Sequence, residues 1–226
     1  VLEETARKYP EYVAYDFMGG SVTYREMVSQ VYACARALKG VGIRENDRVT
    51  ICLPNVPQAL IMFYAVNAVG AIANMIHPLS AEGEIAFYLR DSNSVAAITL
   101  DQFYPKFKNV RKAVELPTLI ITSVSDALTP VMKLGYAVTE KWKIPPVRKE
   151  EPVLPWKEFL RRGSHVELFK VKRSKEDAAV ILYSGGTTGV TKGILLSNFN
   201  FNALAAQIVA TNPFFRPGDR MLAIMP

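Results

Sequence analysis

One stretch late in the sequence combines glycines, hydroxyl side chains and a lysine in a way that suits phosphate binding. Glycines let backbone N–H groups approach an anion closely, hydroxyls donate hydrogen bonds to phosphate oxygens, and a lysine adds a point charge. Apolar runs at 177–183 and 194–196 flank the stretch and predict a strand on either side of a loop. The candidate phosphate-binding residues are Ser184, Gly185, Gly186, Thr187, Thr188, Gly189, Thr191, Lys192 and Gly193.

Two common nucleotide-binding loops do not match this stretch. A Walker loop reads G-x-x-x-x-G-K-[ST] and leads into a helix, whereas Lys192 follows Thr191, precedes Gly193 and leads into a predicted strand. The hydroxyl that holds Mg²⁺ in a Walker loop is therefore missing, and the G-x-G-x-x-G pattern of dinucleotide-binding folds is absent as well. An ordinary Gly/Ser/Thr-rich turn is the simplest alternative, but this composition between two apolar strands disfavours it.

Residues 183–193 resemble the signature Y-T-S-G-T-T-G-x-P-K-G of the adenylate-forming superfamily, which includes acyl-CoA synthetases, peptide-synthetase adenylation domains and luciferases. The resemblance extends over nearly the whole chain, because 23–26 (TYRE), 42–55 (GIRENDRVTICLPN), 70–79 and 217–219 (PGD) also resemble family segments. The signature residues that coincide are Tyr183, Gly186, Thr187, Thr188, Gly189, Lys192 and Gly193.

Several positions depart from the family pattern. Ser184 replaces Thr and keeps the hydroxyl, whereas Gly185 replaces Ser and loses a donor. Thr191 replaces Pro and frees the backbone before Lys192, and Asn198 stands where many members have His. Because the lysine and the paired threonines are kept, the departures bear on loop order and phosphate affinity rather than on the kind of ligand.

The resemblance implies an enzyme that activates a carboxylic acid with ATP and Mg²⁺, releases pyrophosphate and passes the acyl group from an acyl-adenylate to coenzyme A. The loop would position and neutralise the β- and γ-phosphates of ATP. The long basic segment before the loop resembles that of some medium- and long-chain fatty acyl-CoA synthetases, which favours a fatty acid. The alternatives are a coumarate-type aryl-CoA ligase, a peptide-synthetase adenylation domain and, from another class, a non-catalytic nucleotide-binding module.

The resemblance also implies that parts needed for turnover lie outside these 226 residues. In the family, the acyl pocket, the adenine- and ribose-binding segments and a small C-terminal domain with the catalytic lysine come later, so no catalytic residue is assigned within the chain. A strand predicted at 221–225, at the very end of the sequence, likewise suggests a fragment. We expect that this fragment alone does not turn over.

Strands and helices are predicted to alternate along the first half of the chain. A hairpin at 12–24 leads into a helix that Thr23 and Glu26 would cap and that Gly40 and Gly42 would end. This alternation predicts an α/β fold, with a doubly wound and mostly parallel sheet and flanking helices. The resemblance implies that this fold is the incomplete N-terminal large domain of an adenylate-forming enzyme. Further strands are predicted at 48–53, 71–76, 95–100 and 118–122. Further helices are predicted at 57–69 and 101–115, and two more are predicted to begin after a cap at Ser80 and after residue 197.

One stretch, 59–76, is apolar over nearly the length of a membrane span. Asn67 and Asn74 interrupt it, Gly70 divides it, and prolines flank it. A buried helix followed by a buried strand fits the stretch better, because strands covered on both faces read as continuous apolar runs.

The alternation fails at 123–176, where five prolines and many charges predict an insertion. We therefore divide the chain into an α/β subdomain at 1–122, a basic insertion at 123–176, and a strand–phosphate loop–strand–helix segment at 177–226 that begins the next part of the same domain. Between residues 141 and 175 there are 11 basic and 4 acidic residues, net +7, whereas the remaining 16 basic and 17 acidic residues give −1. The basicity thus belongs to this one segment.

A helix predicted at 130–143 carries Val131, Leu134, Val138 and Trp142 on one side. It either packs on the domain surface or provides peripheral contact with an anionic membrane through 130–175. Nucleic-acid binding is disfavoured because the basic residues lack interleaved stacking aromatics.

The cysteines and histidines point to no special chemistry. Cys34 and Cys52 lie among apolar residues, which predicts reduced core thiols and a cytoplasmic protein. His77 and His165 are far apart and lack neighbours at metal-ligand spacing, so no metal site is predicted. The expected partners are small molecules, and the sequence leaves the oligomeric state open.

Overall fold

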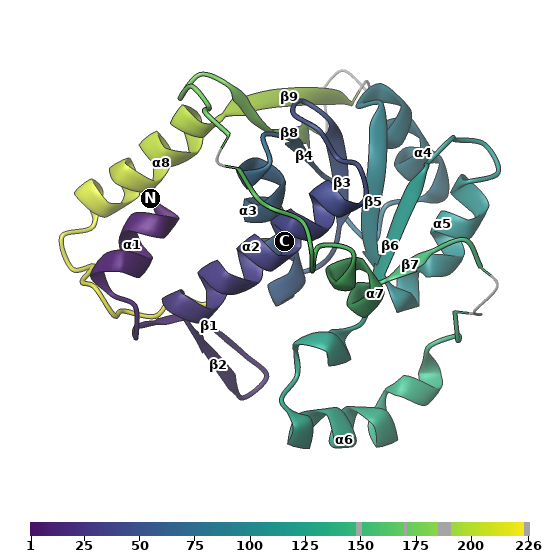
Figure 1. The fold of residues 1–226 in the computed structure, drawn as a ribbon, viewed down its shortest axis with the longest axis horizontal. Helices are drawn as coiled ribbons and strands as arrows, with labels where there is room; N and C mark the ends of the chain where they lie inside the picture. Colours follow the sequence, from purple (N-terminus) through teal and green to yellow (C-terminus); the bar gives the residue numbers. More distant parts are fainter. Residues whose placement is uncertain (148–150, 170, 185–190, 224–226) are drawn as a thin grey trace.

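The fold is a layered α/β arrangement in which helices cover both faces of one large sheet (Figure 1). The computed structural model describes residues 1–226 except 148–150, 170, 185–190 and 224–226. In the described part of the chain, this sheet has seven strands in the order β7-β6-β5-β3-β4-β8-β9. They are β3 (Arg48–Cys52), β4 (Ile72–Met75), β5 (Ser94–Leu100), β6 (Thr118–Thr122), β7 (Leu154–Pro155), β8 (Ala178–Ser184) and β9 (Lys192–Ser197).

The sheet is wound in both directions from β3. The chain adds β4 on one side of β3, then β5, β6 and β7 on the other, and finally returns to place β8 and β9 beside β4. All neighbouring strands are parallel except β8 and β9, which are antiparallel. The predicted doubly wound, mostly parallel sheet is therefore confirmed.

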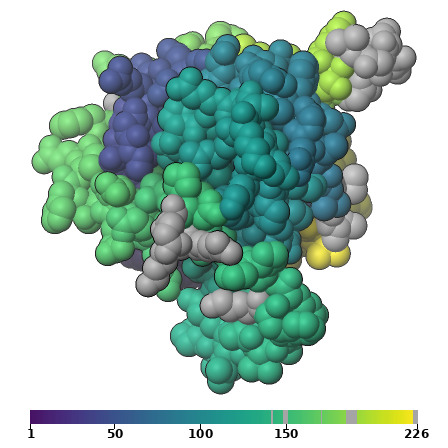
Figure 2. All heavy atoms as spheres, turned by 90° about the vertical axis from the view of Figure 1, so that its right-hand side faces the viewer, coloured from purple at the N-terminus to yellow at the C-terminus, as the bar shows by residue number. Residues whose placement is uncertain are grey.

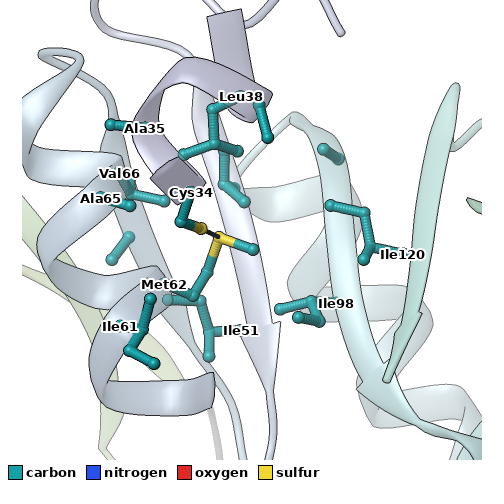
Figure 3. Close-up of a cluster of buried hydrophobic side chains, with 14 of the residues drawn as sticks. Cys34, Ala35, Leu38, Ile51, Ile61, Met62, Ala65, Val66, Ile98 and Ile120 are labelled. Atoms are coloured by element: carbon teal, nitrogen blue, oxygen red, sulfur yellow. Dashed lines mark hydrogen bonds between the residues drawn. The ribbon is translucent and has the colours of Figure 1, made fainter. Parts of the chain in front are cut away.

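Strands in the middle of the sheet send alternate side chains to two separate cores, as the pleat of a strand requires. In β3, Ile51 belongs to the core on one face and Cys52 to the core on the other. Figure 3 shows the first core, where Cys34 and Met62 lie over Ile51 and Ile98 with their sulfur atoms 3.9 Å apart. The first core is covered by α2 (Tyr24–Gly40), α3 (Pro57–Ala68) and α7 (Trp156–Arg161), and the second by α4 (Glu82–Asp91) and α5 (Tyr104–Val110).

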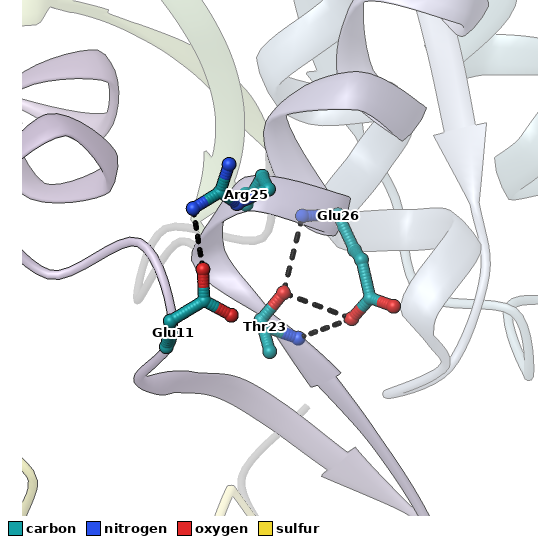
Figure 4. A network of polar contacts seen from close by, with 4 residues as sticks. All are labelled: Glu11, Thr23, Arg25 and Glu26. Atoms are coloured by element: carbon teal, nitrogen blue, oxygen red, sulfur yellow. Dashed lines mark hydrogen bonds and ion pairs between the residues drawn. The ribbon is translucent and has the colours of Figure 1, made fainter.

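The start of α2 carries the predicted capping box (Figure 4). It follows a separate hairpin of β1 (Val13–Phe17) and β2 (Gly20–Thr23). The Thr23 N–H donates to the Glu26 carboxylate at 2.8 Å, and the Glu26 N–H donates to the Thr23 hydroxyl at 3.3 Å. The Thr23 hydroxyl also donates to the Glu26 carboxylate at 2.9 Å, and the two hydrogen bonds that this carboxylate accepts from Thr23 lower the pKa of Glu26. Arg25 adds an ion pair with Glu11.

The apolar stretch 59–76 contains all but the first two residues of α3 and the whole of β4, which confirms a helix followed by a strand. Its two asparagines have partners inside the fold. The Asn67 amide donates to the Phe63 carbonyl at 3.0 Å, and the buried Asn74 amide donates to the Thr50 hydroxyl at 2.8 Å. Among the described residues, none of the helices has the length and apolarity needed to cross a membrane.

Some predicted element boundaries are wrong. The helix predicted after a Ser80 cap has Ala81 at its N-cap, because the Glu84 carboxylate accepts the Ala81 backbone N–H at 2.9 Å. The helix predicted at 101–115 is divided into a 3₁₀ turn (Asp101–Phe103) and α5. An N-terminal helix, α1 (Leu2–Lys8), was not predicted, and residues 221–223 of the predicted final strand are not in a strand.

Part of the predicted insertion belongs to the body of the fold. After α6 (Pro130–Thr139), the chain forms β7 at the edge of the large sheet and then α7, whose Trp156 and Phe159 are buried in the first core. Helices α2 and α7 approach so closely that a Cβ on Gly163 would collide with the Ala37 backbone. Residues 154–163 thus pack into the body of the fold, and the division of the chain at residues 122 and 176 stays a prediction.

We expect Phe159→Ala to lower the free energy of unfolding by about 3–5 kcal/mol, because it leaves a cavity under α7 in a fully buried position. Urea denaturation followed by circular dichroism measures the change. The matched control is Phe169→Ala in the same segment, where the side chain is 76% exposed, and its effect should stay within about 0.5 kcal/mol. Equal, small effects of the two substitutions would mean that α7 is not part of the core.

Candidate functional site

The two ends of the predicted phosphate loop are joined by the β8–β9 hairpin. Ser184 pairs with Lys192, and Tyr183 pairs with Gly193. The structure thus brings Ser184 and Lys192 together across the base of the loop, and Thr191 lies half-buried beside them. The other predicted site residues lie outside the described residues: Gly185, Gly186, Thr187, Thr188 and Gly189.

The loop base lies at the edge of the sheet where ligands bind in open α/β folds. β8 runs parallel to β4, with Val180 opposite Ala73 and Leu182 opposite Met75. Its last residue therefore lies at the carboxyl ends of the parallel strands, the usual position of a binding crevice. The position of the loop base is therefore set by the strand pairing of the whole sheet and not by the loop sequence alone.

Lys192 is placed to meet an anion. Its side chain is exposed, and it forms no ion pair with any residue in the described part of the chain. Its backbone is fixed in β9, while its flexible four-carbon stem lets the ammonium group reach toward a ligand. Together with the Ser184 hydroxyl, it supplies a positive charge and a hydrogen-bond donor at the base of the loop.

Tyr183 fastens the loop base to α4, an element that sequence reasoning did not connect with the site. Its hydroxyl donates to the Asp91 carboxylate at 3.0 Å and to the Tyr88 carbonyl at 3.3 Å, and the Tyr183 and Tyr88 rings lie 4.2 Å apart. Burial, followed by the hydrogen bond to Asp91, raises the pKa of Tyr183, so the phenol stays a neutral donor. No local pattern could reveal this contact because its partners lie far apart in the sequence.

Gly193 fits a narrow space within the same contact. A Cβ at this position would lie 3.2 Å from the Asp91 carboxylate, the Ile181 side chain and the Tyr183 ring. A side chain here would push against both partners of the Tyr183–Asp91 hydrogen bond. The close packing gives Gly193 a steric role in the loop base.

An apolar hollow of about 460 Å³ adjoins the strand that carries the loop. Leu182, two residues before Ser184, forms part of its wall, and Phe63 and Phe201 meet across it with ring centroids 5.7 Å apart. Phe201 belongs to α8 (Asn198–Thr211), where the Ser197 hydroxyl caps the helix by accepting the Asn200 N–H, which confirms the helix predicted after residue 197. The site therefore combines a cationic loop base with an apolar surface on the same strand.

The cysteines and acidic residues supply no metal centre in the described part of the chain, where no group of three or more His, Cys, Asp or Glu side chains could hold an ion. Cys34 and Cys52 are free and buried, as predicted, and burial raises the pKa of the Cys52 thiol to about 12. The residues at the loop base fit the phosphates of a nucleotide, whereas a Mg²⁺ ion there would depend on the phosphates for its ligands.

We expect Gly193→Ala to destabilise the fold by about 1–2 kcal/mol, because the added methyl group crowds Asp91 and Tyr183. Urea denaturation measures the change. A double-mutant cycle with Tyr183→Phe should show that the two substitutions do not change the free energy of unfolding additively, since both act on the same hydrogen bond.

The control for this cycle is Gly135→Ala in α6, where a Cβ would meet nothing within 4 Å. That substitution should be neutral or slightly stabilising, because alanine favours helix. A neutral Gly193→Ala would contradict the proposed packing of the loop base.

Comparisons with known proteins agree with this architecture. The AMP-binding enzyme family matches residues 2–226. A long-chain-fatty-acid–CoA ligase of Bacillus subtilis is 29% identical over 229 residues, covering 100% of this chain and 41% of the relative. The chain therefore spans about two fifths of the length of the curated relatives it matches first.

Solved structures share the fold. A long-chain-fatty-acid-CoA ligase from Archaeoglobus fulgidus superposes with a TM-score of 0.70 at 23% identity, covering 94% of this chain and 39% of that one. An anthranilate CoA ligase in complex with anthranoyl-AMP superposes with a TM-score of 0.72 at 21% identity, covering 93% of this chain and 36% of that one. At these identities the likeness concerns the fold.

Proposed function

Because the chain belongs to the AMP-binding enzyme family, we propose that it forms the phosphate-binding part of an AMP-forming acid–thiol ligase. The observation that carries the proposal is the exposed Lys192 opposite Ser184 at the carboxyl edge of the sheet. A positive charge at this place suits a nucleoside triphosphate, because negative charge develops on the leaving pyrophosphate during adenylation.

In the proposed reaction, an oxygen of the substrate carboxylate attacks the α-phosphorus of ATP, and the bond to the β-phosphate oxygen breaks. Lys192 and the hydroxyl groups of the loop neutralise the departing pyrophosphate, and Mg²⁺ on the phosphates would add to this neutralisation. The coenzyme A thiol then loses its proton to solvent, its sulfur attacks the acyl carbon, and the bond between that carbon and the phosphate oxygen of AMP breaks to release AMP. Tyr183 takes no part in the chemistry; it keeps the loop base against α4.

We propose a medium- or long-chain fatty acid as the acid. The name of the Bacillus subtilis relative supports this choice. The fold does not discriminate, because an anthranilate CoA ligase shares it. Pyrophosphate exchange with a panel of fatty and aromatic acids separates a fatty acyl ligase from an aryl-CoA ligase, and transfer to a carrier protein instead of coenzyme A identifies a peptide-synthetase adenylation domain.

We also propose a cytoplasmic location, supported by the two free, buried thiols, since structural disulfides are typical of oxidising compartments. Nucleic acid is not among the proposed partners. The oligomeric state stays open.

We expect Lys192→Ala to reduce ATP-dependent pyrophosphate exchange by the complete enzyme about 10- to 100-fold in kcat/KM for ATP, because a charge-assisted contact to the leaving group is lost. The matched control is Lys175→Ala, an exposed lysine near the opposite end of β8. An unchanged rate for Lys192→Ala, or an equal loss in both variants, would contradict the assigned role of Lys192.

We expect the 226-residue chain by itself to form no acyl-CoA, whereas the complete enzyme forms it. The measurement is thioester formation from a fatty acid, ATP and coenzyme A at equal molar concentrations of the two proteins. Turnover by the 226-residue chain would refute the assignment of the catalytic parts to other segments. A nucleotide-binding module without catalysis would be indicated if the complete protein bound ATP but showed no pyrophosphate exchange with any acid.

A further inference from the structure

The helix α6 presents its apolar side to solvent. Val131 is 81% exposed, and Leu134 and Val138 are each 72% exposed, whereas Lys133 and Tyr136 on the other side are half-buried. A surface helix of a globular protein normally turns its apolar stripe inward and its charges outward. In α6 this orientation is reversed, so the exposed stripe does not contribute to the core.

The reversed helix lies away from the sheet. Figure 1 shows α6 below the body of the fold, and Figure 2 shows this segment as a separate lobe. Immediately after α6, Trp142 lies in a short 3₁₀ turn (Lys141–Lys143) and is 74% exposed. We call Val131, Leu134 and Val138, together with Trp142 of the following turn, the outer face of α6; the Trp142 side chain also borders a hollow lined by Asp101 and Trp156 of the body of the fold.

The sequence around the outer face is net positive, with three lysines and one glutamate between residues 130 and 144. The Lys143 ammonium lies 5.7 Å from the centroid of the Trp142 ring and forms an ion pair with Glu140 at 3.0 Å, and Lys133 is half-buried on the inner side of the helix. The segment that follows carries most of the net positive charge of the chain, with 11 basic and 4 acidic residues between 141 and 175. Apolar side chains, a tryptophan and lysines in one short helical segment are the features of helices that lie in a membrane interface.

We propose that the outer face of α6 docks on the surface of an anionic phospholipid bilayer, with its apolar side chains among the acyl-chain ends and its lysines at the headgroups. Tryptophan favours this depth because its ring is apolar and its N–H polar. A second copy of the chain fits less well, because a ten-residue helix offers much less than the roughly 800 Å² per partner of a typical stable interface. The proposal does not depend on the proposed catalytic function.

The first test is sedimentation of the 226-residue chain with vesicles of phosphatidylcholine containing phosphatidylglycerol, compared with vesicles of phosphatidylcholine alone. We expect binding to the anionic vesicles that weakens at high salt, since the lysines contribute through electrostatics. Binding should also shift the fluorescence of Trp142 to shorter wavelength, while the buried Trp156 serves as an unchanging background. The variant Trp142→Phe should lose the shift but retain most of the binding.

The decisive variant is Leu134→Asp/Val138→Asp, which should lower the vesicle partition coefficient about tenfold or more. Leu134→Ser/Val138→Ser should lower it as well, which separates lost apolarity from added negative charge. Both changes lie on the exposed side of α6, so circular dichroism and thermal unfolding should match the parent chain.

The matched control is Leu204→Asp/Val209→Asp on α8, a helix whose exposed apolar residues have no charged neighbours within the helix. It should bind vesicles like the parent chain. The proposal is overturned if neutral and anionic vesicles bind equally, if the α8 variant and not the α6 variants loses binding, or if the α6 variants only convert an oligomer into a monomer.

Discussion

The parallel pairing of β8 with β4 is the interaction on which the candidate site depends. The strands formed by the first 122 residues leave one edge of β4 free, and β8 covers it. Because Leu182 pairs with Met75, Ser184 ends β8 at the carboxyl edge of the sheet. A shift of this register by one residue would turn Tyr183 to the opposite face, away from Asp91, and the loop base would lose its contact with α4.

The two ends of β8 are held by different means. At its start, the Arg173 guanidinium donates to the Ala178 carbonyl at 2.8 Å and to the Asn46 side chain at 3.0 Å, and Asn67 of α3 approaches the Ala179 carbonyl at 3.4 Å. At its end, Tyr183 contacts α4. A single hydrogen bond of this kind contributes only about 1 kcal/mol, so the pairing depends on several contacts that form together. The position of the loop base therefore follows from elements on both sides of the sheet.

Local physics explains which parts of the fold could be predicted from the sequence. The Thr23–Glu26 capping box and the apolar strands depend on neighbours within a few residues, so their patterns are visible. The short β7 and α7 were missed because prolines and charges surround them, and only the burial of Trp156 and Phe159 shows that they belong to the core. The composition of the loop led to the prediction of a phosphate ligand, whereas the attachment of Tyr183 to Asp91 arises only when distant segments meet.

This attachment changes the interpretation of the family signature itself. Of the matching residues that the structure describes, Tyr183 and Gly193 have packing reasons that need no ligand: one binds α4, and the other leaves room for that contact. Lys192 has no comparable partner in the described part of the chain and is exposed. In the described part of the signature, Tyr183 and Gly193 therefore have packing roles in the strand pair, beside the phosphate contact that we propose for Lys192. The departures Ser184 and Thr191 are chain neighbours of these packed residues, and Ser184 lies opposite Lys192 in the strand pair.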